Sequence, residues 1–250
     1  MHILALETST EYCSVALWHD DEVRENFQLV GQKHSELLME MLDAVLRDAG
    51  MKLGELDGIA FGAGPGSFTG VRIACGATQG LAFGANLPVA GICTLQALAE
   101  TSDKPRVIAA LDARMGEIYH AVYEKINDEW TTVSEPCLCK AQDAPRVLGA
   151  DWYGVGSGFA LNSAAPPDGR GELLALRYVG QLSGVDSEAV PHAAAIAALG
   201  AAQFAKNLGV DAALAQPFYL RDKVALKTHE REALARSTST LPVRTEDNVA

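Results

Sequence analysis

The chain has 250 residues, 48% of them hydrophobic, so it can bury one large core or two smaller ones. Its 32 acidic residues outnumber the 20 Lys and Arg, and the net charge of -12 opposes direct binding of a polyanion such as nucleic acid. No apolar run approaches the ~20 residues of a membrane span, and the first residues lack the basic flank and cleavage site of a secretion signal. We therefore expect a globular protein of the cytoplasm that makes no contact with a membrane.

The first 30 residues predict a meander of three strands. Residues 3–6 are a short apolar run, residues 12–18 alternate between apolar and polar side chains, and residues 23–30 supply a third strand. Asp20-Asp21 is the predicted turn between the second and third strands. Such a meander can hold a small loop at its first corner, residues 8–11.

A helix is predicted for residues 34–49, followed by Gly50 in the position of a C-terminal cap. Its apolar side chains spread over roughly 200° of the helix surface, more than the ~100° stripe that a single buried face needs. They are Leu37, Leu38, Met39, Met41, Leu42, Val45, Leu46 and Ala49. Either one flank of this helix faces a partner, or the helix is buried within its own fold, and the pattern leaves both open.

Residues 61–72 form a glycine-rich turn between a buried strand (57–61) and a helix (69–83). Glycines at alternate positions let the backbone turn sharply and approach another surface. The spacing matches neither a dinucleotide fingerprint, which needs glycine where Ser67 stands, nor a P-loop. On chemistry alone, a structural turn is favoured over a ligand loop.

The helix after this turn is rich in small residues, among them Gly70, Gly76 and Gly80. Glycine costs about 1 kcal/mol relative to alanine inside a helix. Several glycines in one helix therefore indicate that another backbone packs very close to it.

The second half of the chain repeats the pattern of the first. A strand at 88–92 and a helix at 95–100 belong to the first unit. After residues 103–105, strands are predicted at 107–112, 118–123 and 130–133, with turns at 113–116 and 127–128. Glu7 and Asp112 follow the first strand of each unit. The repeat implies two related lobes whose carboxylates face each other across a cleft.

We predict an N-terminal lobe of residues 1–102, a C-terminal lobe of residues 103–228 and a polar, mobile tail of residues 229–250. Within the second lobe we expect a surface loop at 163–171, an alanine-rich helix at 192–208 that can pack back on the first lobe, and a docking segment at 217–221. Of the five cysteines, Cys137 and Cys139 are too close together and too far from other ligands to complete a zinc site.

Two lobes that each open with a strand meander resemble the α/β fold of the actin, sugar-kinase and Hsp70 superfamily (ASKHA), with its duplicated βββαβα units. Five stretches together resemble the TsaB (YeaZ) family of that superfamily. They are Ile3–Thr10, His34-Ser35-x-x-Leu38, the run Gly-Pro-Gly-Ser-Phe-Thr-Gly-x-Arg at 64–72, Asp112–Tyr119, and Pro217-x-Tyr219-Leu220-Arg221-x-x-Val224-Ala225-x-Lys227. The resemblance covers about residues 1–228, and it departs from the family at Glu7, where the family usually has Asp.

This resemblance implies a non-catalytic scaffold subunit of the bacterial complex that makes threonylcarbamoyladenosine beside the tRNA anticodon. Its partners would be the transferase TsaD, bound as a heterodimer, and the ATPase TsaE, and it would meet tRNA only through the complex. The two N-terminal helices would bind TsaD, and without TsaD the same surface could form a homodimer. The interface residues are His34, Leu37, Leu38, Met41, Leu42 and Val45 on the first helix, and Thr69, Arg72, Ile73, Gly76 and Gly80 on the second.

No catalytic or metal-binding residue is assigned. TsaD-like transferases hold a metal with a His-x-x-x-His pair, but the corresponding segment here, residues 93–97, reads Cys-Thr-Leu-Gln-Ala. The second phosphate turn of the superfamily needs glycines where Ala113-Arg114-Met115-Gly116 stands. Residues 154–158 are interpreted as an ordinary turn rather than an adenosine-binding segment.

The loop residues Glu7, Thr8, Ser9, Thr10, Asp112 and Arg114 are therefore assigned only to vestigial nucleotide or phosphate loops. No cofactor is expected, and whether a nucleotide lies at the shared interface is left open. Two alternatives remain. One is an independent ATP-dependent kinase or ATPase of the same fold, and the less favoured one is a metal-dependent hydrolase of the glycoprotease type.

Overall fold

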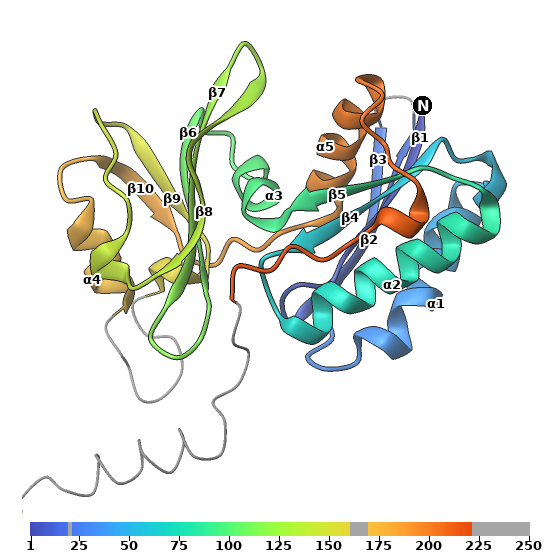
Figure 1. The fold of residues 1–250 in the computed structure, drawn as a ribbon, viewed down its shortest axis with the longest axis horizontal. Helices are drawn as coiled ribbons and strands as arrows, with labels where there is room; N and C mark the ends of the chain where they lie inside the picture. Colours follow the sequence, from blue (N-terminus) through green and yellow to red (C-terminus); the bar gives the residue numbers. More distant parts are fainter. Residues whose placement is uncertain (20–21, 161–169, 222–250) are drawn as a thin grey trace, which may run out of the picture. The chain divides into compact units, whose positions relative to one another are not determined.

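The computed structural model describes residues 1–19, 22–160 and 170–221, which contain two five-stranded sheets (Figure 1). The strand order is β3-β2-β1-β4-β5 in the first sheet and β10-β9-β6-β7-β8 in the second. Read in the opposite direction, the second order is β8-β7-β6-β9-β10, which matches the first order with β6 in the place of β1. The predicted internal repeat and the two-lobed α/β fold class are thus confirmed.

The first sheet begins with the predicted meander. Strands β1 (His2–Glu7), β2 (Tyr12–His19) and β3 (Glu22–Leu29) run antiparallel, and β4 (Gly58–Gly64) and β5 (Val89–Cys93) are added parallel to β1. Alternation explains the meander, while β1 and β4 are almost wholly buried because helices cover both of their faces.

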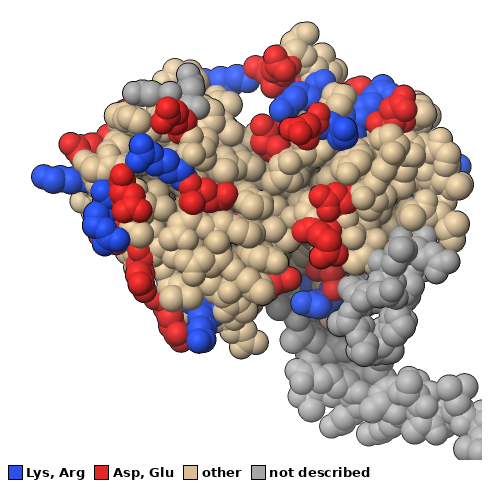
Figure 2. All heavy atoms as spheres, turned by 180° about the vertical axis from the view of Figure 1, so that it is seen from behind, with Lys and Arg blue, Asp and Glu red and all other residues tan. Residues whose placement is uncertain are grey.

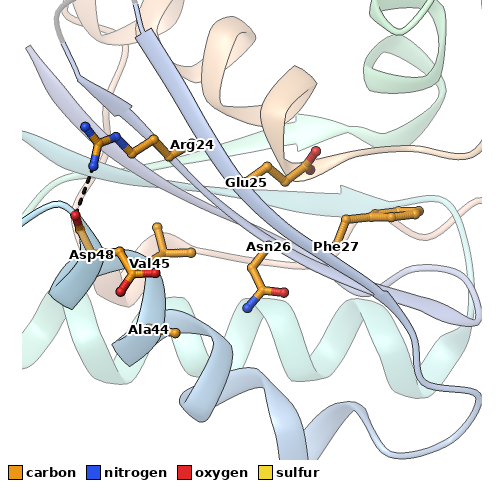
Figure 3. A pocket seen from close by; sticks show the side chains of 7 residues that line it. All are labelled: Arg24, Glu25, Asn26, Phe27, Ala44, Val45 and Asp48. Atoms are coloured by element: carbon orange, nitrogen blue, oxygen red, sulfur yellow. Dashed lines mark hydrogen bonds between the residues drawn. The ribbon is translucent and has the colours of Figure 1, made fainter.

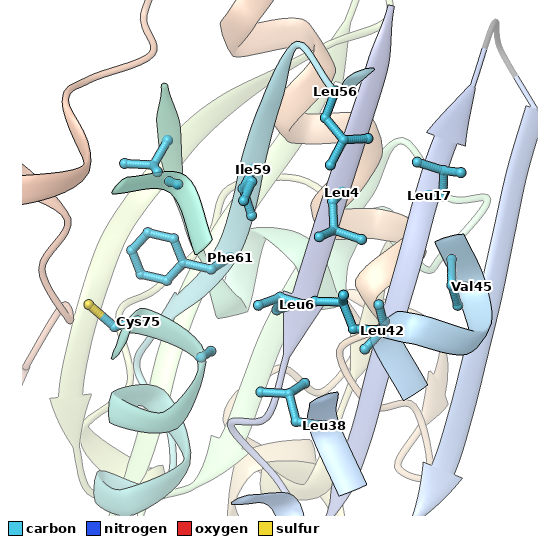
Figure 4. Packing of buried hydrophobic residues seen from close by; sticks show 14 of the residues in the cluster. Leu4, Leu6, Leu17, Leu38, Leu42, Val45, Leu56, Ile59, Phe61 and Cys75 are labelled. Atoms are coloured by element: carbon cyan, nitrogen blue, oxygen red, sulfur yellow. The ribbon is translucent and has the colours of Figure 1, made fainter. Parts of the chain in front are cut away.

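Helices α1 (His34–Asp48) and α2 (Phe68–Ala85) cover one face of the first sheet, and α5 (Ala193–Ala205) covers the other (Figure 1). The α1 side chains that face the sheet recur at helical spacing and are buried against β1, β2 and β4 (Figure 4). Helix α5 approaches the sheet closely because it is built of small residues. A Cβ atom at Gly200 would lie only 2.5 Å from the Cβ of Ala60.

Helix α3 (Thr94–Glu100) follows β5 and packs against the second sheet. That sheet repeats the meander with β6 (Arg106–Asp112), β7 (Ile118–Ile126) and β8 (Glu129–Cys139), followed by β9 (Trp152–Val155) and β10 (Leu182–Asp186). Helix α4 (Arg170–Arg177) packs on it beside a short 3-10 turn, Ala141–Asp143.

Several features differ from the sequence prediction or fall outside what the structure describes. β8 extends well beyond the expected 130–133, and the strands β9 and β10 and the helix α4 were not predicted. The predicted turn at 20–21, most of the loop at 163–171 and the tail at 229–250 lie outside the described residues. Within the described ranges, no helix is both long and apolar enough to cross a membrane.

Candidate functional site: two loops and a helical surface

The glycine-rich turn after β4 closes over the first loop of the chain. The Thr8 Oγ1 hydroxyl donates to the Gly70 carbonyl oxygen at 2.7 Å, and the Ser67 amide donates to the Ser9 carbonyl oxygen at 2.8 Å. A Cβ atom at Gly70 would lie 1.9 Å from the Thr8 carbonyl oxygen, and one at Gly66 would lie 2.6 Å from the Ser9 Cβ. The glycines thus allow two backbone segments to touch, which is the role of a structural turn.

Glu7 ends β1 directly beneath this turn and is almost completely buried. Its Oε1 accepts the Ser9 amide hydrogen, while its Oε2 has no hydrogen-bond partner among the described residues. A Cβ atom at Gly62 would lie 1.8 Å from Oε2, so only glycine leaves room for this carboxyl group. Burial raises the pKa of Glu7 to about 7, against the smaller opposing effect of its hydrogen bonds to Ser9.

The segment before residue 221 docks on the same turn, as predicted for residues 217–221. The Phe218 amide donates to the Ala63 carbonyl oxygen at 2.7 Å, and Arg72 Nε donates to the Tyr219 hydroxyl at 2.7 Å. The Arg72 guanidinium also lies 3.5 Å from the centre of the Phe68 ring. Arg72 therefore lies on the surface of α2 but is held by aromatic side chains on two sides.

The second loop, after β6, folds around its own carboxylate. Asp112 Oδ1 accepts the Arg114 amide hydrogen at 2.6 Å, and Oδ2 lies 3.3 Å from the Arg114 Nη1. The Asp112 amide donates to Ser157 Oγ at 3.0 Å. The Asp112 carboxylate thus takes up a backbone N–H of this turn, the kind of group that a phosphate turn presents to a polyanion.

The glycines at 154–158 also serve packing. Cβ atoms at Gly156 and Gly158 would lie 2.5 Å from the carbonyl oxygen and 2.6 Å from the Cβ of Ala110, respectively. This close approach to β6 supports the interpretation of the segment as a structural turn.

The structure corrects the predicted role of five α1 residues. Leu38, Leu42 and Val45 belong to the core beneath α1 (Figure 4). Met41 belongs to the same core, and His34 is buried with Nε2 3.0 Å from the Tyr12 carbonyl oxygen. These five residues are at most 7% exposed, because the wide apolar arc is largely used inside the lobe. The arc is wide because α1 packs against the sheet and also beside α2.

The two flanks of α1 face different neighbours. Ala44 and Asp48, seven and eleven residues after Leu37, line a groove of about 400 Å³ with β3, so the half-buried Leu37 lies on that flank (Figure 3). Met39 lies on the opposite flank, toward α2, and is 48% exposed. The groove itself is polar, with Arg24 Nη1 donating to the Asp48 carbonyl oxygen at 3.0 Å, and contains none of the loop residues.

The predicted α2 residues do reach the surface. Thr69, Arg72, Gly76 and Gly80 are exposed and Ile73 is half-buried. Cβ atoms at Gly76 and Gly80 would meet no atom within 4 Å, so the close backbone expected there does not come from the described part of this chain. The same face carries Phe83, 82% exposed, which we did not predict. We call Met39 together with Thr69, Arg72, Ile73, Gly76, Gly80 and Phe83 the α1/α2 surface.

A duplicated sheet of this order, with a loop after the first strand of each copy, defines the class as a two-lobed ASKHA-type protein. The family model described as tRNA N6-adenosine threonylcarbamoyltransferase, TsaD, matches residues 28–228. A curated tRNA threonylcarbamoyladenosine biosynthesis protein TsaB from Escherichia coli is 38% identical, over 91% of this chain and 97% of its own length. TsaB from Haemophilus influenzae is 35% identical, over 90% and 95%.

Solved structures agree with these relatives. YeaZ from Pseudomonas aeruginosa is 35% identical and superimposes with a TM-score of 0.77, over 88% of this chain and 99% of that one. The chain therefore belongs to the TsaB (YeaZ) family, as its motifs predicted. Among the residues that the structure describes, no group of three or more His, Cys, Asp or Glu side chains is arranged to hold a metal ion.

Proposed function

We propose that this chain is a subunit of tRNA threonylcarbamoyladenosine biosynthesis in the cytoplasm, and that it supports the TsaD transferase, together with TsaE, without catalysing the transfer itself. The names of its TsaB relatives support the pathway. The match to the TsaD family model supports a partner of similar fold, because related folds can pair through equivalent helices.

The observation that carries the non-catalytic role is the closure of the first loop. Thr8 and Ser9 bond to the glycine-rich turn, and Gly66 and Gly70 approach them too closely for a ligand to lie between. The second loop turns on the Asp112 carboxylate, which would repel a phosphate group. Both loops thus bind parts of this chain where an active member of the superfamily would bind nucleotide.

The α1/α2 surface is the proposed docking site for TsaD. Its glycines leave a shallow track on α2, between the exposed Met39 and Phe83, that a helix of the partner can enter. Without TsaD, a second copy of this chain would use the same surface. On the face shown in Figure 2, Lys and Arg are interspersed with Asp and Glu. Mixed charges do not favour direct binding of a phosphate backbone, which fits contact with tRNA only through the complex.

The docking proposal is tested by co-purification of the full chain with TsaD. Gly80→Leu places a bulky side chain in the track, where its Cβ meets no described atom within 4 Å, and we expect it to abolish capture of TsaD. Ala202→Leu is the matched control, because Ala202 is exposed on α5, on the other face of the sheet. Equal capture by both variants would exclude the α1/α2 surface as the docking site.

The non-catalytic role is tested separately with the purified chain alone. We expect neither ATP hydrolysis nor transfer of threonylcarbamoyl from its adenylate to tRNA, and transfer once TsaD and TsaE are added. Turnover of either substrate by the isolated chain would overturn the proposal.

A further inference from the structure

Four chemically reactive side chains meet in the second lobe, away from both loops. Cys137 and Cys139 are half-buried on the same side of β8, and all five cysteines are free thiols. His120 on β7 is fully buried and lies directly opposite Cys137 in the strand register. Tyr178, after α4, packs its ring against His120, with ring centroids 6.0 Å apart. Direct cross-strand neighbours have Cβ atoms about 5 Å apart, so the imidazole and the Cys137 thiol are in reach of each other.

The hydrogen bonds of Tyr178 determine which nitrogen of His120 carries the proton. The Tyr178 hydroxyl donates its only hydrogen to the Pro145 carbonyl oxygen at 2.6 Å. Its contact of 2.8 Å with His120 Nε2 therefore requires Nε2–H to donate to the Tyr178 oxygen. In the neutral imidazole, Nδ1 is then the unprotonated nitrogen. Nδ1 is buried and makes no hydrogen bond within the described residues, so its lone pair is available to a proton donor.

The neighbouring Cys137 thiol is the group that can donate its proton to His120 Nδ1. The neighbouring Cys139 thiol lowers the pKa of Cys137 to about 5, and the His120 imidazole contributes in the same direction. The same contact with Cys137 raises the pKa of Cys139, with further contributions from burial and from the carboxylates of Asp143 and Glu117. Cys137 is thus the thiolate of the pair, and Cys139 keeps its proton while its neighbour is charged.

We propose that Cys137 is a nucleophilic site for small disulfides. His120, which Tyr178 holds in one tautomer, activates Cys137, and Cys139 resolves the mixed disulfide that forms on it. His120 Nδ1 takes the Cys137 proton, and the thiolate attacks one sulfur of a disulfide RS–SR. The Cys137–SR bond forms as the S–S bond breaks, and the leaving thiolate takes the proton back from His120. Cys139, no longer beside a charge, loses its proton to Nδ1 and attacks the Cys137 sulfur, which releases the second RSH.

The net reaction is balanced: one small disulfide is reduced to two thiols, and Cys137 and Cys139 are oxidised to one intrachain disulfide. Residues two apart on a strand have Cα atoms about 6.6 Å apart, near the upper limit of about 6.8 Å for a disulfide. A disulfide also needs Cβ atoms about 3.5–4.5 Å apart, so closure requires β8 to bend locally and bring the two side chains together.

The first test compares thiols within the same unmodified chain. The full chain is labelled with iodoacetamide between pH 6 and pH 8, and each cysteine peptide is quantified by mass spectrometry. A thiol that is already ionised reacts at a rate that does not change over this range, whereas an ordinary thiol accelerates about tenfold per pH unit. We expect a flat profile for Cys137 and a rising one for the half-buried Cys93, whose pKa is raised by burial.

At pH 6 the higher thiolate fraction of Cys137 is partly offset by its lower intrinsic nucleophilicity, so we expect it to react about tenfold faster than Cys93. A Cys137 profile that rises like that of Cys93 would overturn the proposal, and this comparison does not depend on how stable any variant is. His120→Gln and Tyr178→Phe should each give Cys137 a labelling rate that rises with pH. Tyr178→Phe removes only the hydroxyl and keeps the ring that packs in the core.

The second test uses oxidised glutathione. In the unmodified chain we expect the intrachain Cys137–Cys139 disulfide, and in Cys139→Ser a trapped mixed disulfide on Cys137. Cys75→Ser is the control and should behave as the unmodified chain. Glutathione found equally on Cys93 and Cys137 of Cys139→Ser would also overturn the proposal.

Discussion

Replacement of Glu7 by Gln tests the account of the first loop. Glu7 is 1% exposed, lies against Gly62, and has one oxygen without a partner in the described residues. An ionised carboxylate there loses its hydration without full compensation, whereas a glutamine of the same size still accepts the Ser9 amide hydrogen. The substitution therefore removes the charge and leaves the packing unchanged.

The sign follows from the pKa of Glu7, about 7 in the folded chain against 4.5 when unfolded. Below pH 4.5 both states are protonated and the group contributes nothing. Between pH 4.5 and 7 only the folded state keeps the proton, so the free energy of unfolding falls as the pH rises. Above pH 7 the full cost is reached, about 3 kcal/mol at 1.36 kcal/mol per pH unit.

The measurement is urea unfolding followed by circular dichroism at pH 5, 6, 7 and 8. We expect Glu7→Gln to raise the free energy of unfolding at pH 8 by up to about 3 kcal/mol, and by less than about 1 kcal/mol at pH 5. Glu40→Gln, an exposed glutamate on α1, is the control and should follow the unmodified chain. If Glu7→Gln shows the same pH dependence as the unmodified chain, the buried carboxyl group does not carry the charge penalty described.

Five further substitutions test the close packing, the open surface and one hydrogen bond of the first loop. Gly70→Ala should destabilise the chain by about 2 to 3 kcal/mol, because its Cβ would meet the Thr8 carbonyl oxygen. Gly80→Ala on the same helix should instead stabilise the chain by about 1 kcal/mol. If Gly70→Ala leaves the free energy of urea unfolding unchanged, the loop is not closed as described. Leu38→Glu buries a carboxyl group in the core and should cost at least about 3 kcal/mol, whereas Met39→Glu should leave stability within about 0.5 kcal/mol and weaken capture of TsaD. Thr8→Val removes the hydroxyl that binds the Gly70 carbonyl oxygen, and a loss of about 1 to 2 kcal/mol in urea unfolding is expected.

Alternating and apolar patterns predicted the strands of both meanders, and the repeated strand–turn–strand unit predicted the duplication. The patterns failed where an element is short or has no buried position. β9 has four residues, and β10, Leu-Ser-Gly-Val-Asp, has five, none of them buried and with Val185 on the exposed side. A bulge in the pairing of β7 with β8 concealed the true length of β8.

Site prediction failed where a property depends on three-dimensional contacts. The apolar arc of α1 showed how many side chains are buried but not that its own lobe buries Leu38 and Met41. Nothing in the sequence showed that Glu7 is enclosed. The only signal was Gly62 on β4, because a glycine in a strand can mark a place where another group approaches closely. The pairing of His120 with Cys137 depends on a strand register that the bulge makes impossible to count from the sequence.

The return of α5 to the first sheet has a consequence for biosynthesis. Residues 193–205 cover a face of that sheet which strands from residues 2–93 have already formed. While the ribosome is still adding the second lobe, this apolar face has no cover of its own and is a natural target for chaperones. A fragment that ends after α3 would keep that face open permanently, so the first lobe is completed only after the strands of the second lobe have been synthesised.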